Sequence, residues 1–435
     1  MTWMIQLVFV AVVAVPIYFL IRRIKQIRRN ILLGKDLDRS DRSGDRWKAM
    51  MLIAFGQKKM FKKPIPAFLH LLIYVGFLVI NLEVLEFLID GLFGTHRIFA
   101  PYLGAFYNVA MNIFECLALG VLISCIAFLI RRNVIKVSRF TKPEMKGWPA
   151  MDGNLILIIE CVLMMAILKM NAADQVLQSR GVAGYVDTGH LMISSLMIPI
   201  FEHFSDGFLI FTERAAWWFH IIGIFTFAVY VTYSKHLHIF LAFPNTYYSN
   251  LAPKGKIQNM DAVTKEVKSM LGMPVEGGSE PPTEVGTFGA KDASDLSWKS
   301  LMEAYSCTEC GRCTTECPAN QTGKLLSPRK IMMDTRDRIE EIGAGQGEGK
   351  SLLGDFITKE EINACTSCNA CTEACPINID PLSIILEMKR YVAMEESGSP
   401  ASWNSMFSNI ETNFAPWKFS PTDRFNWAQD LNDKN

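Results

Sequence analysis

The chain has 435 residues, half of them hydrophobic, and its mean hydropathy is +0.18. This composition excludes an ordinary soluble protein, in which charged residues form a larger share of the chain. The formal net charge of +1 provides no basic excess of the kind that would indicate nucleic acid as a partner.

Five long apolar runs lie in the first part of the chain. They cover residues 4–21, 66–90, 106–130, 153–170 and 215–233. Each run is close to the ~20 residues that a helix needs to cross a bilayer. Buried helices of a soluble core are the alternative, but five runs with so few charges favour a membrane. We therefore predict an all-α fold in which residues 1–240 form a five-helix transmembrane bundle.

The loops between these runs indicate the orientation of the bundle. Lysine and arginine are dense in 22–63 and 131–146, whereas 91–105 holds one arginine and 171–214 is mixed to acidic. Positive loops remain on the cytoplasmic side of a membrane. The first run lacks a basic leader and a cleavage site, so we interpret it as a retained helix. This predicts a multi-pass protein of the bacterial inner membrane, with its N-terminus outside and everything after Lys235 in the cytoplasm.

Three histidines in and beside the apolar runs are candidate cofactor residues. His220 and His238 are eighteen residues apart, so one continuous helix would place them on the same face at opposite depths. His70 lies at the depth expected for His238, and two facing imidazoles suit a bis-histidine haem b. The alternative is that they line a quinone pocket. We expect His236 to be interfacial or solvated.

His220 has two open interpretations. A second haem would need a ligand on the second helix about ten residues after His70, where Ile80 stands. His203, on the outer segment, is the favoured substitute partner. The rival interpretation is that His220 serves a quinone site. His96, in a short outer loop, is expected to be solvated.

Three cytoplasmic segments follow the predicted bundle. We expect a linker over 241–299, rich in proline, glycine, serine and threonine, a helical cluster domain over 300–396, and an aromatic tail over 397–435. Ser327 and Pro328 indicate the start of a helix inside the cluster domain. The tail either packs on its own cluster domain or docks on a partner.

Eight of the eleven cysteines occur in two copies of the spacing C-x2-C-x2-C-x3-C-P. In this bacterial ferredoxin pattern, three thiolates of each run bind one [4Fe–4S] cluster and the fourth binds the other cluster. The predicted first set is Cys307, Cys310, Cys313 and Cys375. The predicted second set is Cys365, Cys368, Cys371 and Cys317. Structural zinc is the alternative for paired CxxC motifs, but it does not require two four-cysteine runs closed by proline.

Parts of the sequence resemble known families. The segment from His220 to YSKHLHIF at 233–240 resembles the last helix of respiratory nitrate reductase gamma subunits, which implies haem-ligand roles for His220, His238 and His70. The outer ligand of that family is replaced by Ile80. The cysteine domain, with LSPRKI, is similar to heterodisulfide reductase iron–sulfur subunits and to the helical cluster domain of succinate dehydrogenases. The tail resembles the stretch that leads into CCG domains in fused relatives.

This resemblance implies a heterodisulfide reductase-like membrane protein. We expect a subunit of a quinone-linked oxidoreductase that relays electrons between a cytoplasmic partner, two [4Fe–4S] clusters, haem b and membrane quinone. Substrate chemistry would lie on a partner chain, either a CCG-domain iron–sulfur protein or an electron transfer flavoprotein. Two alternatives remain: a subunit of an electron-transfer-flavoprotein:quinone oxidoreductase, and a haem-free membrane-anchored scaffold or redox sensor.

Overall fold

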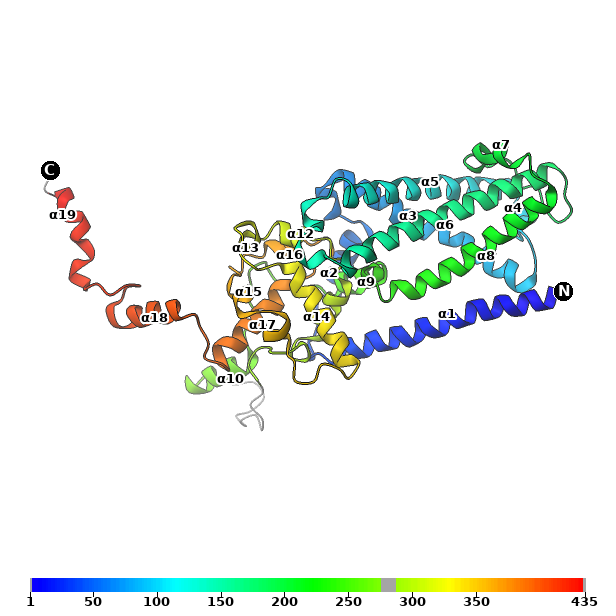
Figure 1. Ribbon diagram of the computed structural model, residues 1–435. Helices are drawn as coiled ribbons and strands as arrows, with labels where there is room; N and C mark the ends of the chain where they lie inside the picture. The colour runs from blue at the N-terminus through cyan, green and yellow to red at the C-terminus, as the bar shows by residue number, and fades with distance from the viewer. Residues whose placement is uncertain (1, 275–286, 433–435) are drawn as a thin grey trace.

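The computed structural model describes residues 2–274 and 287–432, and it is helical throughout with no strands in these ranges (Figure 1). Its five long helices are α1 (Thr2–Ile31), α3 (Pro64–Phe93), α5 (Ala105–Asn133), α6 (Trp148–Ser179) and α8 (Asp206–Val231). All five are long and apolar enough to cross a membrane. The predicted all-α architecture of a five-helix bundle followed by a dicluster domain is therefore confirmed.

The long helices lie side by side at one end of the molecule (Figure 1). Helix α6 packs between α5 and α8, α3 packs on α5, and α1 lies against α8. The core between them includes Phe9, Phe87 and Trp217, whereas the opposite faces of the helices carry exposed aliphatic side chains. Since lipid tails are as apolar as leucine, such faces are expected of helices that meet a bilayer.

Short helices fill the loops of the bundle and the approach to the cluster domain. At the bundle end away from the cluster domain lie α4 (Ala100–Leu103) and α7 (Ile198–Phe201), with a 3-10 turn over Ser194–Met197 (Figure 1). At the other end are α2 (Ser43–Met50), a π-helical turn over Met51–Phe55, 3-10 turns over Met60–Lys62, Ser138–Phe140, Pro143–Met145 and Lys235–Leu237, α9 (His238–Tyr247) and α10 (Asp261–Met270).

The cluster domain is a compact group of helices with its own core. It contains α11 (Trp298–Ser306), α12 (Arg312–Thr315), α13 (Pro318–Gln321), α14 (Pro328–Gly343), α15 (Lys359–Asn363), α16 (Ala370–Ala374) and α17 (Pro381–Met394). Ser327 caps α14 by accepting from the Lys330 N–H, and Pro328 takes its first position, as predicted. Before α11, a 3-10 turn over Ala293–Asp295 packs into this core. The last residues of the linker predicted over 241–299 therefore pack with the cluster domain.

Helix α1 joins the two parts of the molecule. Its last turns leave the bundle and bury Ile27 and Ile31 in the core of the cluster domain. Arg23 forms an ion pair with Glu340 at 2.6 Å, and Asn30 donates to the Tyr305 hydroxyl at 3.0 Å. The cluster domain is thus held against the end of the bundle rather than tethered by a chain.

The last membrane helix ends earlier than predicted. Helix α8 stops at Val231, a 3-10 turn follows, and α9 begins at His238, so His220 and His238 do not share one continuous helix. Ser234 breaks the helix because its backbone is extended and its hydroxyl accepts from the His236 N–H at 3.0 Å. The histidines are nonetheless both turned into the bundle, as described below.

Two further helices, α18 (Ala401–Asn413) and α19 (Asn426–Asn432), form the aromatic tail and extend away from the cluster domain (Figure 1). The rings of Trp403, Phe407, Trp417 and Trp427 are exposed. Packing of these rings on the chain's own cluster domain, one of the two expectations for the tail, is therefore not observed.

Candidate metal and cofactor centre

The two cysteine loops have the same local backbone. Glu309 and Gly311 in the first loop have φ values of 54° and 71°, and Ser367 and Asn369 occupy the equivalent positions of the second loop with 57° and 61°. Left-handed conformations are uncommon outside glycine, so their repetition at matched positions reflects a shared requirement. The chain must curl so that three successive cysteines face one point.

The structure brings the first predicted cysteine set together. Cys307, Cys310, Cys313 and Cys375 line one cavity of about 350 Å³. The pKa of both Cys307 and Cys375 is raised to about 12, chiefly by burial and with neighbouring cysteines contributing. These thiols therefore need bound cations to become thiolates, which is the condition that iron supplies.

The second set is grouped in the same way. Burial raises the pKa of Cys365, and Cys317 and Cys368 lie close enough to raise it further. The pKa of Cys371 is raised to about 12, chiefly by burial and with Asp380 and Cys365 contributing. The last cysteine of each run thus lies with the first three of the other run.

The donor set fits iron–sulfur clusters. The cysteines form no disulfides, and backbone N–H groups of Ser367 and Ile379 donate to the sulfurs of Cys365 and Cys375 at 3.4 and 3.3 Å. Such N–H···S bonds are among the groups that set the potential of a cluster. Among the described residues, no three His, Cys, Asp or Glu side chains meet at the spacing of a single metal ion.

His70 from α3 and His238 from α9 face each other in the same cavity as the first cysteine set. Their ring centroids are 6.4 Å apart, with an interplanar angle of 41°. Two imidazoles bound on opposite sides of one iron through bonds of about 2 Å would have centroids about 6 Å apart. The separation therefore fits a haem iron between the rings.

The hydrogen bonds of these rings also fit metal ligation. His70 Nδ1 donates to Gln57 Oε1 at 3.1 Å, and His238 Nδ1 donates to the Lys235 carbonyl at 3.2 Å. Each bond fixes the tautomer that leaves Nε2 with a free lone pair, as ligating histidines usually require. Arg132, Arg139 and Arg312 line the same cavity and provide cationic partners for the carboxylates that a haem carries.

His236 differs from its prediction. It is not solvated but lines this cavity, with its ring centroid 5.4 Å from that of His238. Burial lowers the pKa of His236 well below its usual value, and it lowers the pKa of His238 to about 4. Both rings are therefore neutral at pH 7, and hydrogen bonding distinguishes His238 as the better oriented ligand.

A buried ion pair connects the histidine site with the first cysteine loop. Lys235, whose carbonyl holds His238, forms an ion pair through its ammonium group with Glu309, which lies between Cys307 and Cys310. Arg336 reaches the same carboxylate at 2.8 Å. Burial raises the pKa of Glu309, but its two cationic partners outweigh burial and hold the pKa below its usual value.

We expect Lys235→Met to destabilise the junction by about 3 kcal/mol, because removing one partner leaves a buried carboxylate less compensated. Thermal unfolding of the detergent-solubilised chain would measure this loss. Lys62→Met is the matched control: Lys62 also pairs with a glutamate of a cysteine loop, Glu373 at 2.6 Å, but it is exposed. That exposed pair should contribute below about 1 kcal/mol. Equal losses in both variants would contradict a special role for Lys235.

A second cavity, of about 240 Å³, surrounds His220. His220 is 1% exposed and its Nδ1 donates to the Leu163 carbonyl at 3.2 Å, which leaves Nε2 free. Ile80 and Asn81 of α3 line the same cavity, so the depth predicted for His220 agrees with the structure. Apolar Ile80 therefore stands where an opposing haem ligand would be needed.

The proposed pairing of His203 with His220 is not observed. The His203 side chain is 79% exposed and lies beside Glu202 at the end of the bundle away from the cluster domain, whereas His220 is buried within the bundle. The turn after α7 points His203 away because the preceding apolar residues, including Phe201, occupy the interior. A second haem thus lacks the axial partner that we predicted for it.

Glu160 is a candidate residue that the sequence analysis did not single out. It projects from the middle of α6 and lines both cavities, between the His70–His238 pair and His220. The sequence could have indicated this residue, because Glu160 is the one charged residue in the apolar stretch 153–168. An ionisable residue inside a membrane helix is a functional hypothesis by default.

Comparisons with known proteins agree with the cysteine geometry. Residues 303–379 match the family described as the 4Fe-4S dicluster domain. The chain is 26% identical to the probable iron-sulfur-binding oxidoreductase FadF of Bacillus subtilis and 26% identical to the EtfAB:quinone oxidoreductase of Syntrophomonas wolfei, with 98% of the chain covered in each case. It spans 61% and 60% of the lengths of these relatives.

A shorter similarity concerns a subunit of another enzyme. Over 32% of the chain, the sequence is 25% identical to one subunit of the dihydromethanophenazine:CoB–CoM heterodisulfide reductase of Methanosarcina mazei, and 36% of that subunit is covered. No solved structure matches the chain significantly. The chain therefore combines a 4Fe–4S dicluster domain with a helical bundle suited to a membrane.

Proposed function

We propose that this chain is the membrane-bound electron-transfer subunit of a quinone-linked oxidoreductase. One observation carries the proposal: four cysteines of the first set and the facing pair His70 and His238 line a single cavity. A one-electron carrier held by the thiols would therefore lie beside one held by the histidines. Electrons could pass between the cytoplasmic clusters and the interior of the bundle without leaving the protein.

The proposed cofactors are two [4Fe–4S] clusters and one haem b, each of which supplies one-electron redox chemistry when bound. The two cysteine sets would each hold one cluster, and their thiolates would offset the positive charge of the iron. His70 and His238 would hold the haem iron through their ring nitrogens, and Gln57 and Lys235 orient these rings. The described arrangement supports one haem rather than two, because Ile80 faces His220.

We propose the cavity around His220 as the quinone site. The His220 tautomer fixed by Leu163 presents an acceptor Nε2, and Glu160 presents a carboxyl group from the facing helix. Oxidation of a quinol there breaks two O–H bonds and releases two protons and two electrons. His220 and Glu160 can take the protons, while the electrons pass one at a time towards the His70–His238 site.

We expect Glu160→Gln to slow quinol oxidation by about 100-fold, because a positioned proton acceptor contributes at least this much to such a step. The rate is measured from the absorbance change of the purified chain after mixing with menadiol. Glu160→Asp should recover most of the rate. Met164→Leu, which alters the same cavity wall without a titratable group, is the packing control. Loss of rate in the Met164→Leu variant equal to that of Glu160→Gln would show that shape alone matters.

The orientation is part of the same proposal. The basic C-terminal turns of α1 and the basic loop before α6 lie at the end of the bundle that contacts the cluster domain. This placement supports a cytoplasmic cluster domain and an external N-terminus in a bacterial inner membrane. Protease added to intact spheroplasts should leave the cluster domain uncut, and cleavage there would reverse the proposed topology.

Two versions of this function differ in the soluble partner that exchanges electrons with the clusters. The similarity to an EtfAB:quinone oxidoreductase favours an electron transfer flavoprotein, while the similarity to a heterodisulfide reductase subunit favours a CCG-domain iron–sulfur protein. The exposed aromatic tail is the proposed docking element. Mass spectrometry of proteins that co-purify with the tagged chain tests this. A partner with neither flavin nor CCG domains would contradict both versions.

The haem-free scaffold or redox sensor remains the alternative of a different class. It predicts no b-type band in a reduced-minus-oxidised spectrum of purified membranes. The facing rings of His70 and His238, each with its outer nitrogen hydrogen-bonded, favour the haem-containing version.

A further inference from the structure

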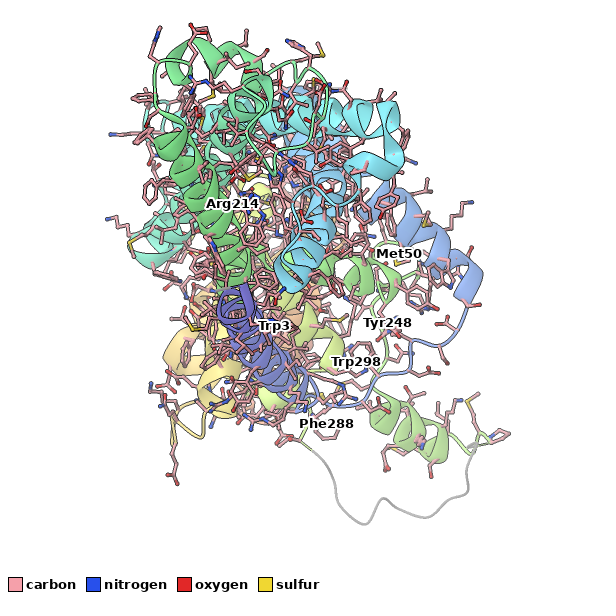
Figure 2. All side chains as sticks on the ribbon, turned by 90° about the vertical axis from the view of Figure 1, so that its right-hand side faces the viewer. Trp3, Met50, Arg214, Tyr248, Phe288 and Trp298 are labelled. Carbon is pink, nitrogen blue, oxygen red and sulfur yellow. The ribbon has the colours of Figure 1, made fainter. Side chains whose placement is uncertain are left out.

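A second group of polar side chains lies inside the bundle at the end away from the cluster domain. Glu83 of α3, Arg97 of the loop after α3, Asp174 of α6 and Glu213 of α8 are each no more than 3% exposed. Figure 2 looks onto this end and labels Arg214, the neighbour of Glu213. Burying this many charges is costly unless they are paired or have a function.

Three carboxylates near this group are fully satisfied and have a structural role. Glu86 accepts from the Phe99 N–H and the Tyr107 hydroxyl, and Asp90 accepts from the backbone of residues 97 and 98. Glu115 accepts from Asn171 and from the backbone of residues 193 and 194. These bonds hold the outer loops onto the helices.

Two of the remaining carboxylates and one histidine differ because each has a free polar atom. Glu83 Oε2, Asp174 Oδ1 and His96 Nδ1 are buried and have no hydrogen-bond partner. In a protein interior such atoms are rare and require an explanation. The second polar atom of each of these three side chains contacts another member of the group. The unsatisfied atoms therefore lie along one connected set of side chains.

The distances define a continuous series. Glu83 Oε1 is 3.3 Å from Arg97 Nη1, and Asp174 Oδ2 is 3.2 Å from Arg97 Nε. His96 Nε2 lies 3.6 Å from Asp174 Oδ1 and 3.7 Å from Glu213 Oε1. His96, which we expected to be solvated, instead bridges two carboxylates and is 16% exposed.

The two ends of this series lie at different depths. At the inner end, Glu83 is one turn from Ile80 and next to Val84 on α3, and both of these neighbours line the His220 cavity. At the other end, Glu213 pairs with Arg214, whose side chain is 38% exposed. The series thus begins beside the wall of the proposed quinone cavity and ends at the surface away from the clusters.

The carboxylates in this series outnumber its arginines. Arg97 pairs with Glu83 and Asp174, and Arg214 pairs with Glu213, so three carboxylates face two fixed cations. An excess of negative charge in a low-dielectric interior attracts a proton. A proton that enters the series meets free acceptor atoms on Glu83, Asp174 and His96.

We propose that Glu83, Arg97, Asp174, His96 and Glu213 form a proton path from the His220 cavity to the face of the bundle away from the clusters. This inference rests on the proposed quinone chemistry. When a quinol is oxidised in the cavity, its two electrons leave towards His70 and His238. Its two protons leave through Glu83 and Asp174 to His96 and Glu213, while Arg97 positions the two carboxylates.

The path is tested in proteoliposomes that contain the full, cofactor-loaded chain with its cluster domain facing outwards. Menadiol is the electron donor, pyranine trapped in the lumen reports protons, and the visible spectrum reports electrons. We expect the wild type to acidify the lumen as its spectrum is reduced. Glu83→Gln and Asp174→Asn should each slow both signals at least about tenfold. Reduction by dithionite, which needs no quinol proton, should be unchanged.

Two further variants separate proton transfer from packing. Glu83→Asp keeps a titratable carboxyl and should recover most of the rate, whereas Glu202→Gln, at an exposed carboxylate of the same end of the bundle, should behave like the wild type. Proton release to the external medium would overturn the path. So would rates in Glu83→Gln and Asp174→Asn within about twofold of the wild type, or an equal loss in Glu202→Gln. A wild type that menadiol does not reduce would instead refute the quinone chemistry itself.

Discussion

Replacing His238 with alanine should abolish the b-type absorption band of the purified chain, and replacing His70 should do the same. The two rings face each other at 6.4 Å between centroids, and each has its Nδ1 hydrogen-bonded and its Nε2 free. Removing either ring would leave only one of the two histidines that would hold a haem in this cavity. Pyridine haemochrome assay and the reduced-minus-oxidised spectrum measure haem content directly.

His236→Ala is the matched control for this prediction. His236 lines the same cavity and its ring is 5.4 Å from that of His238, yet its Nδ1 has no hydrogen bond of the kind that holds His238. We expect the control to retain its haem, with at most a small change in band position. A control that loses the band while His238→Ala keeps it would move the ligand assignment to His236.

The substitutions Cys375→Ser and Cys307→Ser should remove the same cluster, although the two cysteines belong to different runs. Both line the cavity that also contains Cys310 and Cys313, and both are deeply buried. Loss of a thiolate ligand from a [4Fe–4S] cluster commonly prevents its assembly, so each variant should contain about half the wild-type iron. Electron paramagnetic resonance of the reduced chain would show which cluster signal is lost.

The complementary variants distinguish the two sets. Cys317→Ser and Cys365→Ser should both remove the other signal, because Cys317 lies beside Cys365 in the second group. Cys116→Ser, at an exposed cysteine of α5 that lines neither cavity, should retain both clusters. If Cys375→Ser removed the signal lost in Cys365→Ser, each run would hold its own cluster and the crossed grouping would be wrong.

The sequence was sufficient where the determinants are local. The two cysteine runs carry their spacing in eleven residues each, and the left-handed positions at Glu309 and Ser367 follow from that spacing rather than from glycine. The five apolar runs likewise predicted the five long helices, because a bilayer requires long uninterrupted apolar stretches. The cap at Ser327 was readable for the same local reason.

Features that depend on tertiary contacts could not be predicted from the sequence. The break after Val231 depends on Ser234 and on Asp152, which accepts from the Lys235 N–H at 3.1 Å across the bundle. We expected His236 to be interfacial or solvated and His96, in a short loop, to be solvated. Their positions inside the protein arise from neighbours far away in the chain. The pairing of Glu83, Arg97 and Asp174 also joins distant segments.

The prediction for His203 failed for a related reason. Proximity in sequence to the outer end of α8 suggested that it could reach inwards, but the apolar side chains around α7 compete better for the interior. Glu160, by contrast, could have been found, since a single acid inside an apolar run stands out without any structure.

Electrons are proposed to pass from quinol to the His70–His238 site and then to the clusters. Anaerobic mixing of the purified chain with menadiol tests this order most directly. Following the cluster and b-type absorbance together in His238→Ala and Cys307→Ser variants separates the steps. The account predicts that quinol no longer reduces the clusters in His238→Ala, whereas it still reduces the b-type band in Cys307→Ser. Reduction of the clusters at the wild-type rate in His238→Ala would show that electrons reach them by another route and would contradict the account.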